Sequence, residues 1–549
     1  MATIFKNGKF FKGVEAEKAN SGATAECMIT NHDLITYIGP EDNPLVANAL
    51  SDASTTTVDL AGKWVLPGFI DGHMHLLLLG SALKRVNLEP CKSLDDIRAA
   101  IKQYALSNPH VPRILCRGWM HPMTNGVALA SMIDDLDPRP IFIDSKDLHS
   151  TWCNSAALAE LGVETEPNPD GGEIHRDEHG RASGLISEAA AQVFVWPHIA
   201  RVQPLEDKLA SFKAAINAYS AAGYTGMVDM AMDENAWEAL QILQSRERLP
   251  VRLAAHWLIN PKSTVEENLA QVNRAIELHK QFNAETSPDL RIAGIKVICD
   301  GVVDACTAAL CEPYASNGSS CEPLWREDML RSVVKHADAA GLQCALHAIG
   351  DKAVKMAIDA LEDACGPGKR HRIEHLEVTR PEDAQRLGKL GITASVQAVH
   401  ADPAILRAWP KLLGHERCGR AFAYKDFLDQ GAALALGTDS PTAPYFALPN
   451  IYTATTRRSA REPESVETVN DHFALSLAQG LSAASKGSAY SCFADKFTGS
   501  LQQGLKADFA IVDMDFTAEN LLKAKVCETW FDGQKVFQRA SPHQFIVPK

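Results

Sequence analysis

Residues 65–75 read Val65-Leu66-Pro67-Gly68-Phe69-Ile70-Asp71-Gly72-His73-Met74-His75, an apolar run that ends in two histidines separated by one residue. If the apolar part is a β-strand, His73 and His75 project to the same side at its C-terminal end, because side chains alternate along a strand. Neutral imidazoles are good ligands for zinc and similar ions. In a chain with 19 histidines, an isolated His-x-His is more often incidental than a metal site. The rest of the chain therefore decides what this pair means.

The composition is that of an ordinary globular protein. The chain has 549 residues, more than a single hydrophobic core usually supports, so we expect one large domain with a smaller one. Apolar residues make up 46% and charged residues 22%. The net charge of −14 and the absence of a Lys/Arg-rich run argue against nucleic acid or an anionic membrane as a partner.

Targeting signals and disulfide patterns are not apparent. The N-terminal residues lack the apolar core of a signal peptide, and no apolar run approaches 18 residues. The 13 cysteines include no Cys-x-x-Cys pair, which fits free thiols in a reducing cytosol better than a disulfide framework. We therefore expect a cytoplasmic protein with no membrane partner.

Both ends of the chain are rich in short predicted strands. Asn7-Gly8 is a hairpin signal at the N-terminus. The two ends are predicted to form one small composite β-sandwich from residues 1–64 and 495–549. The strand-like segments lie near residues 3–5, 26–29, 34–39, 507–513 and 526–537.

The middle of the chain, residues 65–494, alternates apolar strands with helical patterns, which favours an α/β fold of the distorted (β/α)8 barrel type. An insertion over about 76–220, with strand-like runs at 114–119 and 140–144, is predicted to form a cap over the barrel. Helical patterns cover 265–282, 328–340 and 352–364. The eight candidate barrel strands lie near 67–73, 225–230, 251–258, 294–299, 343–348, 372–375, 392–397 and 433–438.

Polar residues stand in or just after five of these strands, where active sites of such barrels form. Each has an ordinary structural explanation, such as a hydrogen-bonded histidine, a lysine that reaches the surface, or an aspartate in a turn. Together they place four histidines, one lysine and one aspartate at one end of one barrel. They are His73, His75, Lys296, His347, His375 and Asp439.

The order of these residues resembles the amidohydrolase superfamily, and more narrowly its YtcJ-like family, which includes N-substituted formamide deformylases. The resemblance covers nearly the whole chain. The runs that carry it are residues 67–75, Arg117-Gly118-Trp119, Trp152-Cys153-Asn154-Ser155, Gly184-Leu185-Ile186-Ser187-Glu188, Gly294-Ile295-Lys296, His347-Ala348-Ile349-Gly350-Asp351, Arg372-Ile373-Glu374-His375, Gly437-Thr438-Asp439, Gly499-Ser500-Leu501 and Gly504-Leu505-Lys506-Ala507-Asp508.

The resemblance implies a metal-dependent hydrolase of a small amide, N-acyl or N-formyl compound, as a homodimer or tetramer. His73 and His75 would bind one divalent ion and His347 and His375 a second, with zinc preferred but manganese, iron and nickel also compatible. Lys296, converted by CO2 to an N6-carboxylate, would bridge the ions. Asp439 would bind metal and carry the proton from water to the leaving amine.

The substrate remains open at this stage. Candidate substrate-binding residues are Trp119, His149, Trp152, Gln397 and His400, and Asp300 and Glu188 are candidates for supporting the site. Cyclic-amide hydrolysis, deamination and decarboxylation are alternative reactions on the same site. A non-catalytic scaffold is a further alternative, but such proteins typically lose metal ligands, and every expected ligand is present.

Overall fold

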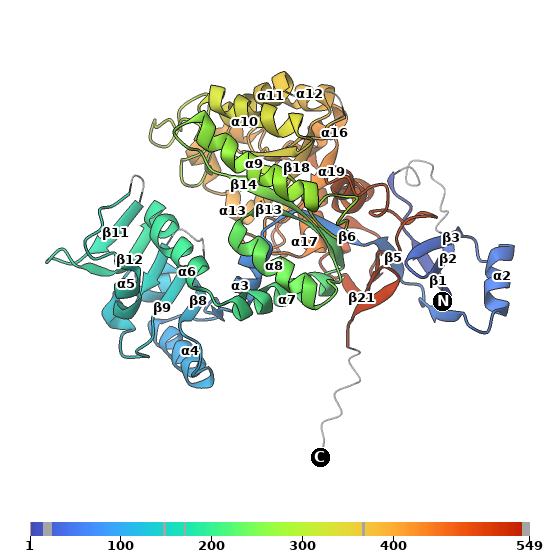
Figure 1. The fold of residues 1–549 in the computed structure, drawn as a ribbon, viewed down its shortest axis with the longest axis horizontal. Coiled ribbons are helices and arrows are strands. Elements are labelled where there is room, and N and C mark those ends of the chain that lie inside the picture. The colour runs from blue at the N-terminus through green and yellow to red at the C-terminus, as the bar shows by residue number, and fades with distance from the viewer. Residues whose placement is uncertain (1, 15–24, 147–149, 170–171, 365–367, 541–549) are drawn as a thin grey trace, which may run out of the picture. The chain divides into compact units, whose positions relative to one another are not determined.

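The computed structural model describes residues 2–14, 25–146, 150–169, 172–364 and 368–540. The chain divides into two compact units. The barrel unit comprises Met1–Leu76, Ile216–Asp233 and Glu247–Lys549, and the inserted unit comprises Leu77–Ala215 and Glu234–Arg246. Each unit has its own sheets and core (Figure 1).

The barrel unit contains eight parallel strands whose spatial order follows the chain, from β6 to β19. Met74 of β6 forms a parallel bridge with Ser440, four residues after β19, and the His73 carbonyl accepts hydrogen bonds from the amides of Thr438 (3.2 Å) and Asp439 (2.7 Å). The predicted eight strands and the nearly closed barrel are thereby confirmed. The strands are β6 (Phe69–Met74), β13 (Tyr224–Met232), β14 (Arg252–Ile259), β15 (Leu290–Ile298), β16 (Gln343–Ala348), β17 (Arg372–His375), β18 (Thr393–Val396) and β19 (Leu434–Leu436).

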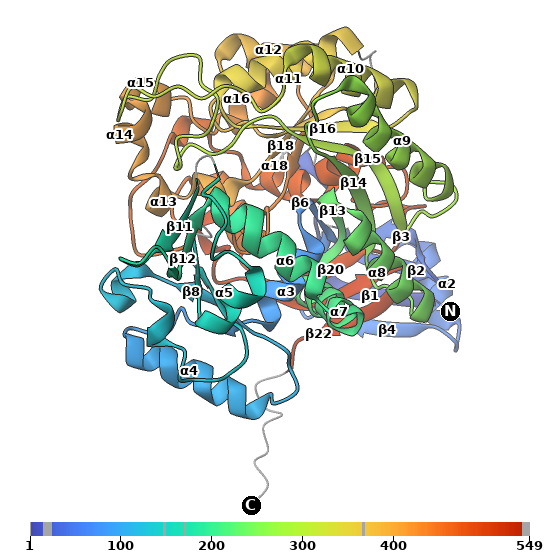
Figure 2. The same ribbon diagram turned by 60° about the vertical axis from the view of Figure 1, so that its left-hand side comes forward.

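The barrel strands are buried along almost their whole length, as expected for parallel strands covered by helices. Figure 2 shows the green-to-yellow helices α9 to α12 outside strands β14 to β18. Helix α9 begins at a capping box in which the Thr264 hydroxyl accepts from the Glu267 amide and the Glu267 carboxylate accepts from the Thr264 amide. The helices of this part are α9 (Val265–Gln281), α10 (Glu327–Ala339), α11 (Asp351–Ala364), α12 (Pro381–Leu390), α13 (Pro403–Leu406), α14 (Trp409–Leu413), α15 (His415–Cys418), α16 (Tyr424–Asp429), α17 (Ala447–Thr456), α18 (Leu477–Ser482) and α19 (Ser488–Ser491).

Both ends of the chain contribute to one further sheet of the barrel unit, in the order β22-β21-β20-β5-β1-β2-β3 with β4 beside β1. Its core includes Phe5, Phe509 and Trp530, whose rings contact one another at centroid distances of 5.0 to 5.6 Å. The composite β-sandwich stays a prediction. The strands are β1 (Ala2–Phe10), β2 (Ala25–Asn31), β3 (Leu34–Gly39), β4 (Thr56–Asp59), β5 (Trp64–Pro67), β20 (Phe509–Asp513), β21 (Lys525–Phe531) and β22 (Gln534–Gln538); helix α2 is Pro44–Ser51.

The hairpin expected at Asn7-Gly8 is wrong. Strand β1 runs through both residues, and its pairing with β2 shifts register between Lys6 and Phe10. Asn7 has φ of 56°, the left-handed conformation that makes Asn-Gly a turn signal, but here it serves an irregularity inside a strand.

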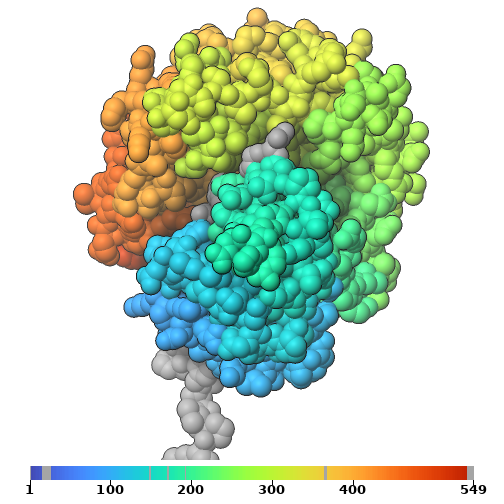
Figure 3. All heavy atoms as spheres, turned by 90° about the vertical axis from the view of Figure 1, so that its left-hand side faces the viewer, coloured from blue at the N-terminus to red at the C-terminus, as the bar shows by residue number. Residues whose placement is uncertain are grey.

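The inserted unit contains a six-stranded sheet in the order β11-β12-β10-β9-β8-β7. Its surface is part of the blue-to-teal region in Figure 3. No helix in the described parts of either unit has the length and apolar character needed to cross a membrane. The strands are β7 (Val86–Asn87), β8 (Ile114–Trp119), β9 (Ile141–Ser145), β10 (Ser150–Cys153), β11 (Gly172–Arg176) and β12 (Ala182–Glu188); the helices that lie wholly or largely in this unit are α3 (Leu76–Lys84), α4 (Leu94–Ser107), α5 (Ser155–Leu161), α6 (Trp196–Val202), α7 (Leu205–Ala221) and α8 (Glu234–Arg246).

Candidate metal centre

The predicted metal-binding side chains meet at the C-terminal ends of the barrel strands. One carboxylate oxygen of Asp439 lies 3.1 Å from His75 Nε2 and 3.4 Å from His73 Nε2. The ring of His375 is 4.9 Å from that of His73 and 4.4 Å from that of His347, measured between centroids. Side chains from four strand ends, more than 350 residues apart in sequence at the extremes, thus form one cluster.

Asp439 is held as an anion by the two histidines of the first strand. Burial raises the pKa of its carboxyl, but the hydrogen bonds with His73 and His75 outweigh burial and keep that pKa well below its usual range. A buried carboxylate that stays ionised can bind a cation or accept a proton from water.

Glu374 and Arg372 fix the orientation of His73. Glu374 Oε2 lies 2.7 Å from His73 Nδ1, while Arg372 donates to Glu374 Oε1 at 2.6 Å and to Oε2 at 3.1 Å. All three side chains have at most 1% of their surface exposed. When His73 is neutral with its proton on Nδ1, donated to Glu374, its Nε2 atom on the side of Asp439 carries the lone pair that a metal needs.

Asp71 ties the first strand to the last. Its carboxylate accepts hydrogen bonds from the His73 amide (3.1 Å), the Thr438 amide (2.9 Å) and hydroxyl (2.6 Å), and the Tyr219 hydroxyl (2.8 Å). A Cβ on Gly437 would lie 2.5 Å from the His73 amide nitrogen, so only glycine allows this approach. The sequence prediction missed these residues, although Asp71 and Gly437 lie inside the motifs it used.

Lys296 lies in β15 with 2% of its surface exposed. Burial lowers the pKa of its ammonium group to about 8, although Glu374 and Asp439 oppose that shift. The neutral amine, which is the form that reacts with CO2, is therefore accessible near neutral pH. Asp300, two residues after β15, accepts from the amides of Ala309, Ile349 and Gly350 and so braces the loops that follow β15 and β16.

His400 and Glu377 complete the cluster. His400 Nδ1 lies 3.2 Å from Glu377 Oε1, and His400 Nε2 lies 3.6 Å from Asp439 Oδ2. Burial alone would lower the pKa of His400, but the hydrogen bond to Glu377 and the charge of Asp439 raise it. Sequence analysis missed Glu377, whose only signal is its position two residues after His375.

Gln397 follows β18 on the inward side. Thr393, Ser395 and Gln397 alternate along the strand, and Ser395 accepts from Arg372 inside the barrel. Gln397 has 1% of its surface exposed, and neither its amide oxygen nor its amide nitrogen has a hydrogen-bond partner among the described residues. A buried amide of this kind is free to pair with a bound polar group.

The donor set fits a divalent metal ion. One donor atom from each of His73, His375 and Asp439 lies within 4.8 Å of the other two, and all three residues are buried. In addition, the Nδ1 atom of His375 is buried with no hydrogen-bond partner in the part of the chain that the structure describes. Imidazole and carboxylate together are ligands for zinc and several other divalent ions.

The sequence profile of the amidohydrolase family matches residues 56–537, most of the chain and all of the strands that carry this cluster. The chain belongs to the amidohydrolase family. The membership predicted from the motifs is thereby confirmed.

Relatives of this amidohydrolase span nearly its whole length. It is 31% identical over 506 residues to the protein LONG AFTER FAR-RED 3 of Arabidopsis thaliana, covering 88% of this chain and 84% of the relative. It is 23% identical over 555 residues to an N-substituted formamide deformylase of Arthrobacter pascens, covering 94% and 95%. The crystal structure of an uncharacterized metal-dependent hydrolase from Pyrococcus horikoshii matches with a TM-score of 0.78 and 26% identity, covering 94% and 98%.

Four predicted residues of the amidohydrolase belong to the insertion. Trp119 and Trp152 lie in the core of the inserted unit with 0% exposed surface, and their indole nitrogens donate to Thr124 and Leu129 of the same unit. Packing accounts for both tryptophans, and their contact with substrate stays a prediction. His149 lies outside the described residues, and Glu188 ends β12.

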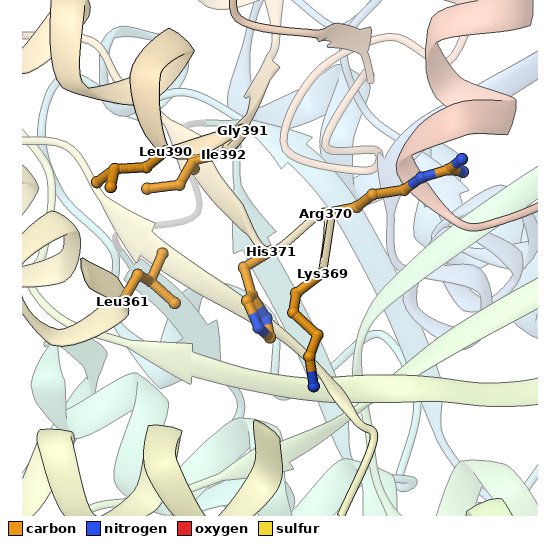
Figure 4. Close-up of a pocket in the computed structure, with 7 residues that line it drawn as sticks. All are labelled: Leu361, Lys369, Arg370, His371, Leu390, Gly391 and Ile392. Carbon is orange, nitrogen blue, oxygen red and sulfur yellow. The ribbon is translucent and has the colours of Figure 1, made fainter. Parts of the chain in front are cut away.

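A further histidine, His371, lies at the opposite end of the barrel strands. It lines a cavity of about 10 Å³ at the N-terminal ends of β17 and β18, shown in Figure 4 with Lys369 and Arg370. His371 accepts from the Cys344 amide at 2.8 Å and pairs with Asp338 at 3.1 Å. It is a satisfied structural histidine, in a cavity with room for about one water molecule.

Proposed function

We propose that this protein is a metal-dependent hydrolase that cleaves the C–N bond of a small amide, N-acyl or N-formyl compound. The observation that carries the proposal is the contact of Asp439 with both His73 and His75, with Glu374 behind His73. The names of two relatives, a metal-dependent hydrolase and a formamide deformylase, support the same reaction class.

Six side chains would hold the metal, as one ion or two. When bound, zinc or a similar ion polarises the scissile carbonyl and lowers the pKa of a water molecule from 15.7 to roughly 7. Lys296, buried and easily deprotonated, would take up CO2 and offer two carboxylate oxygens. The donors are His73, His75, Lys296, His347, His375 and Asp439.

The protein's own residues account for the proton transfers and for binding. Asp439, ionised in its buried position, accepts the proton of the attacking water and returns it to the leaving amine nitrogen. Gln397 offers an amide that has no hydrogen-bond partner among the described residues, complementary to the C=O and N–H of an amide substrate. His400 lies beside Asp439 and is a second candidate for contact with substrate.

The test combines metal content with turnover of an amide panel that includes N-substituted formamides, N-acyl amines and cyclic amides. We expect Asp439→Asn to lose about 10²- to 10⁴-fold in kcat, the usual contribution of a general acid–base, while it still binds metal through the histidines. Asp508→Asn is the matched control, since Asp508 is also a buried carboxylate and pairs with Arg252 at the start of β14, away from the site.

Three results would contradict the proposal. A wild-type protein that takes up no divalent metal would exclude the hydrolase site. Full turnover by metal-loaded Asp439→Asn would remove Asp439 from the proton transfers. Hydrolysis of cyclic amides, with no turnover of any open-chain amide, would show that the proposed substrate class is wrong.

A further inference from the structure

After helix α17 the chain returns to the loop that follows β18. Asp402, two residues after His400 in that loop, accepts hydrogen bonds from the amides of Ala460 (2.9 Å) and Arg461 (3.3 Å). The Ser459 hydroxyl also accepts from the Arg461 amide, at 3.2 Å. Asp402 and Ser459 have at most 1% of their surface exposed, so water does not compete for these contacts. The backbone of Arg461 is therefore held beside the loop that carries His400.

The side chain of Arg461 is exposed, and its guanidinium has no ion pair or hydrogen-bond partner among the described residues. The next residue, Glu462, does not serve it, because that carboxylate pairs with Arg407 at 2.5 Å. Arg407 also pairs with Glu467, at 3.0 Å. The positive charge of Arg461 is thus available to a bound molecule.

The charge of Arg461 acts on the metal cluster. Burial and Arg461 both lower the pKa of His400, while the hydrogen bond to Glu377 and the charge of Asp439 raise it and prevail. Interaction between charges falls with distance, and solvent screens it beyond roughly 10 Å. The guanidinium therefore lies near the His400 imidazole, whose Nε2 atom is 3.6 Å from Asp439 Oδ2.

The buried carboxylates of the site already have partners, whereas this cation has none among the described residues. Asp439 contacts two histidines, Glu377 contacts His400, and Glu374 contacts Arg372 and His73. A guanidinium binds a carboxylate through two parallel N–H···O bonds. A protein with a net charge of −14 repels anions, so an anionic substrate needs such a cation close to the reacting bond.

We propose that the substrate of this hydrolase carries a carboxylate and that Arg461 binds it. The inference rests on the proposed function and narrows its substrate class to anionic amides, such as the N-acyl derivatives of amino acids. Gln397 would face the amide that is cleaved, and Arg461 the charged end of the same molecule. Arg461 then determines specificity, because it contacts a part of the substrate that does not react.

The test uses two pairs of amides in which one member carries a carboxylate and the other lacks it. N-acetylleucine, in both enantiomers, is compared with N-isopentylacetamide, which places the carboxylate on the amine half. N-butylsuccinamate is compared with N-butylpropanamide, which places it on the acyl half. In at least one pair, wild-type kcat/KM should be about tenfold or more higher for the anionic member.

Variants then assign that preference to one side chain. In Arg461→Met the preference should fall about tenfold or more, mainly through KM, because the lost ion pair is present in both the ground state and the transition state. Arg461→Lys keeps the charge and should retain part of the preference. Arg458→Met is the matched control, since Arg458 is also exposed and lies three residues earlier in the same segment; it should keep the wild-type preference.

Four results would overturn the inference. Equal kcat/KM for both members of each pair in the wild type would show that the hydrolase does not recognise a carboxylate. A preference that survives in Arg461→Met would place the carboxylate elsewhere. An equal loss in Arg458→Met would show a general effect of surface charge. These three leave the hydrolase in place, whereas the absence of turnover of every amide, anionic or neutral, would overturn the proposed function as well.

Discussion

Substitution of Glu374 by Gln removes the charge that orients His73 and leaves the shape of the side chain intact. Glu374 Oε1 accepts from Arg372, and Oε2 accepts from both Arg372 and His73. In Glu374→Gln the amide nitrogen replaces one of these two oxygens, and at either position it faces a hydrogen-bond donor. At the first position it meets the Arg372 guanidinium. At the second it can donate to His73 Nδ1, which shifts the proton of His73 to Nε2 and removes the lone pair that a metal needs. Zinc affinity should fall 10- to 100-fold, about 1.4 to 2.8 kcal/mol.

The same substitution should destabilise the fold. Arg372 has 0% exposed surface and would lose the one charged partner that it has among the described residues, a change that typically costs about 3–5 kcal/mol. We expect the lower end of that range, because Ser395 and Ser491 still accept from the guanidinium at 2.7 and 3.1 Å. Although burial raises the pKa of Glu374, Arg372 and His73 hold it well below its usual range. Its stabilisation is therefore present at neutral pH and is lost as the pH falls through the acid range.

Two measurements separate the loss of zinc affinity from the loss of stability. Chelator competition gives the zinc affinity, and thermal unfolding of the metal-free protein gives the stability. Asp508→Asn also removes a buried carboxylate from a buried arginine, Arg252, and should lower thermal stability without changing zinc affinity. Wild-type zinc affinity in Glu374→Gln would refute the role given to Glu374. An equal loss of affinity in Asp508→Asn would show that general destabilisation, rather than the orientation of His73, weakens the site.

Three further predictions concern the same site. Gly437→Ala should weaken zinc binding and lower stability by about 1–3 kcal/mol, because the added Cβ meets the His73 amide nitrogen at 2.5 Å; unchanged melting and zinc affinity would contradict that approach. The rate of CO2-dependent zinc uptake, measured at a constant concentration of dissolved CO2, should rise about tenfold per pH unit and level off above about pH 8. The reason is that the lowered pKa of Lys296 leaves its amine neutral above that pH; a rate that does not change with pH would exclude this amine. Gln397→Leu should leave thermal stability unchanged and raise KM more than it lowers kcat, because the amide has no partner to lose in the described structure; a large loss of stability would show that the amide is structural.

The barrel could be predicted because its strands are buried on both faces, and most of them read as short, largely apolar runs separated by helical patterns. His73, Lys296, His347 and Asp439 stand out from such runs, and the parallel arrangement alone places strand ends together. Asp71 carries no comparable signal. Its hydrogen bond from the His73 amide is local, but the other three come from Thr438 and Tyr219, partners that only the closed barrel brings within reach.

The direction of the side chains after β17 could not be predicted from alternation. Glu374 points into the barrel at His73, so regular strand geometry would turn His375 to the opposite face, toward the helices. The left-handed conformations of His375 and Leu376 break the alternation, and the His375 ring instead contacts those of His73 and His347. Neither residue is the Gly or Asn that usually marks such a bend, so the sequence carries no local signal for it. The resemblance to a family could assign His375 to the metal, but only the bend explains how Glu377 also reaches the site.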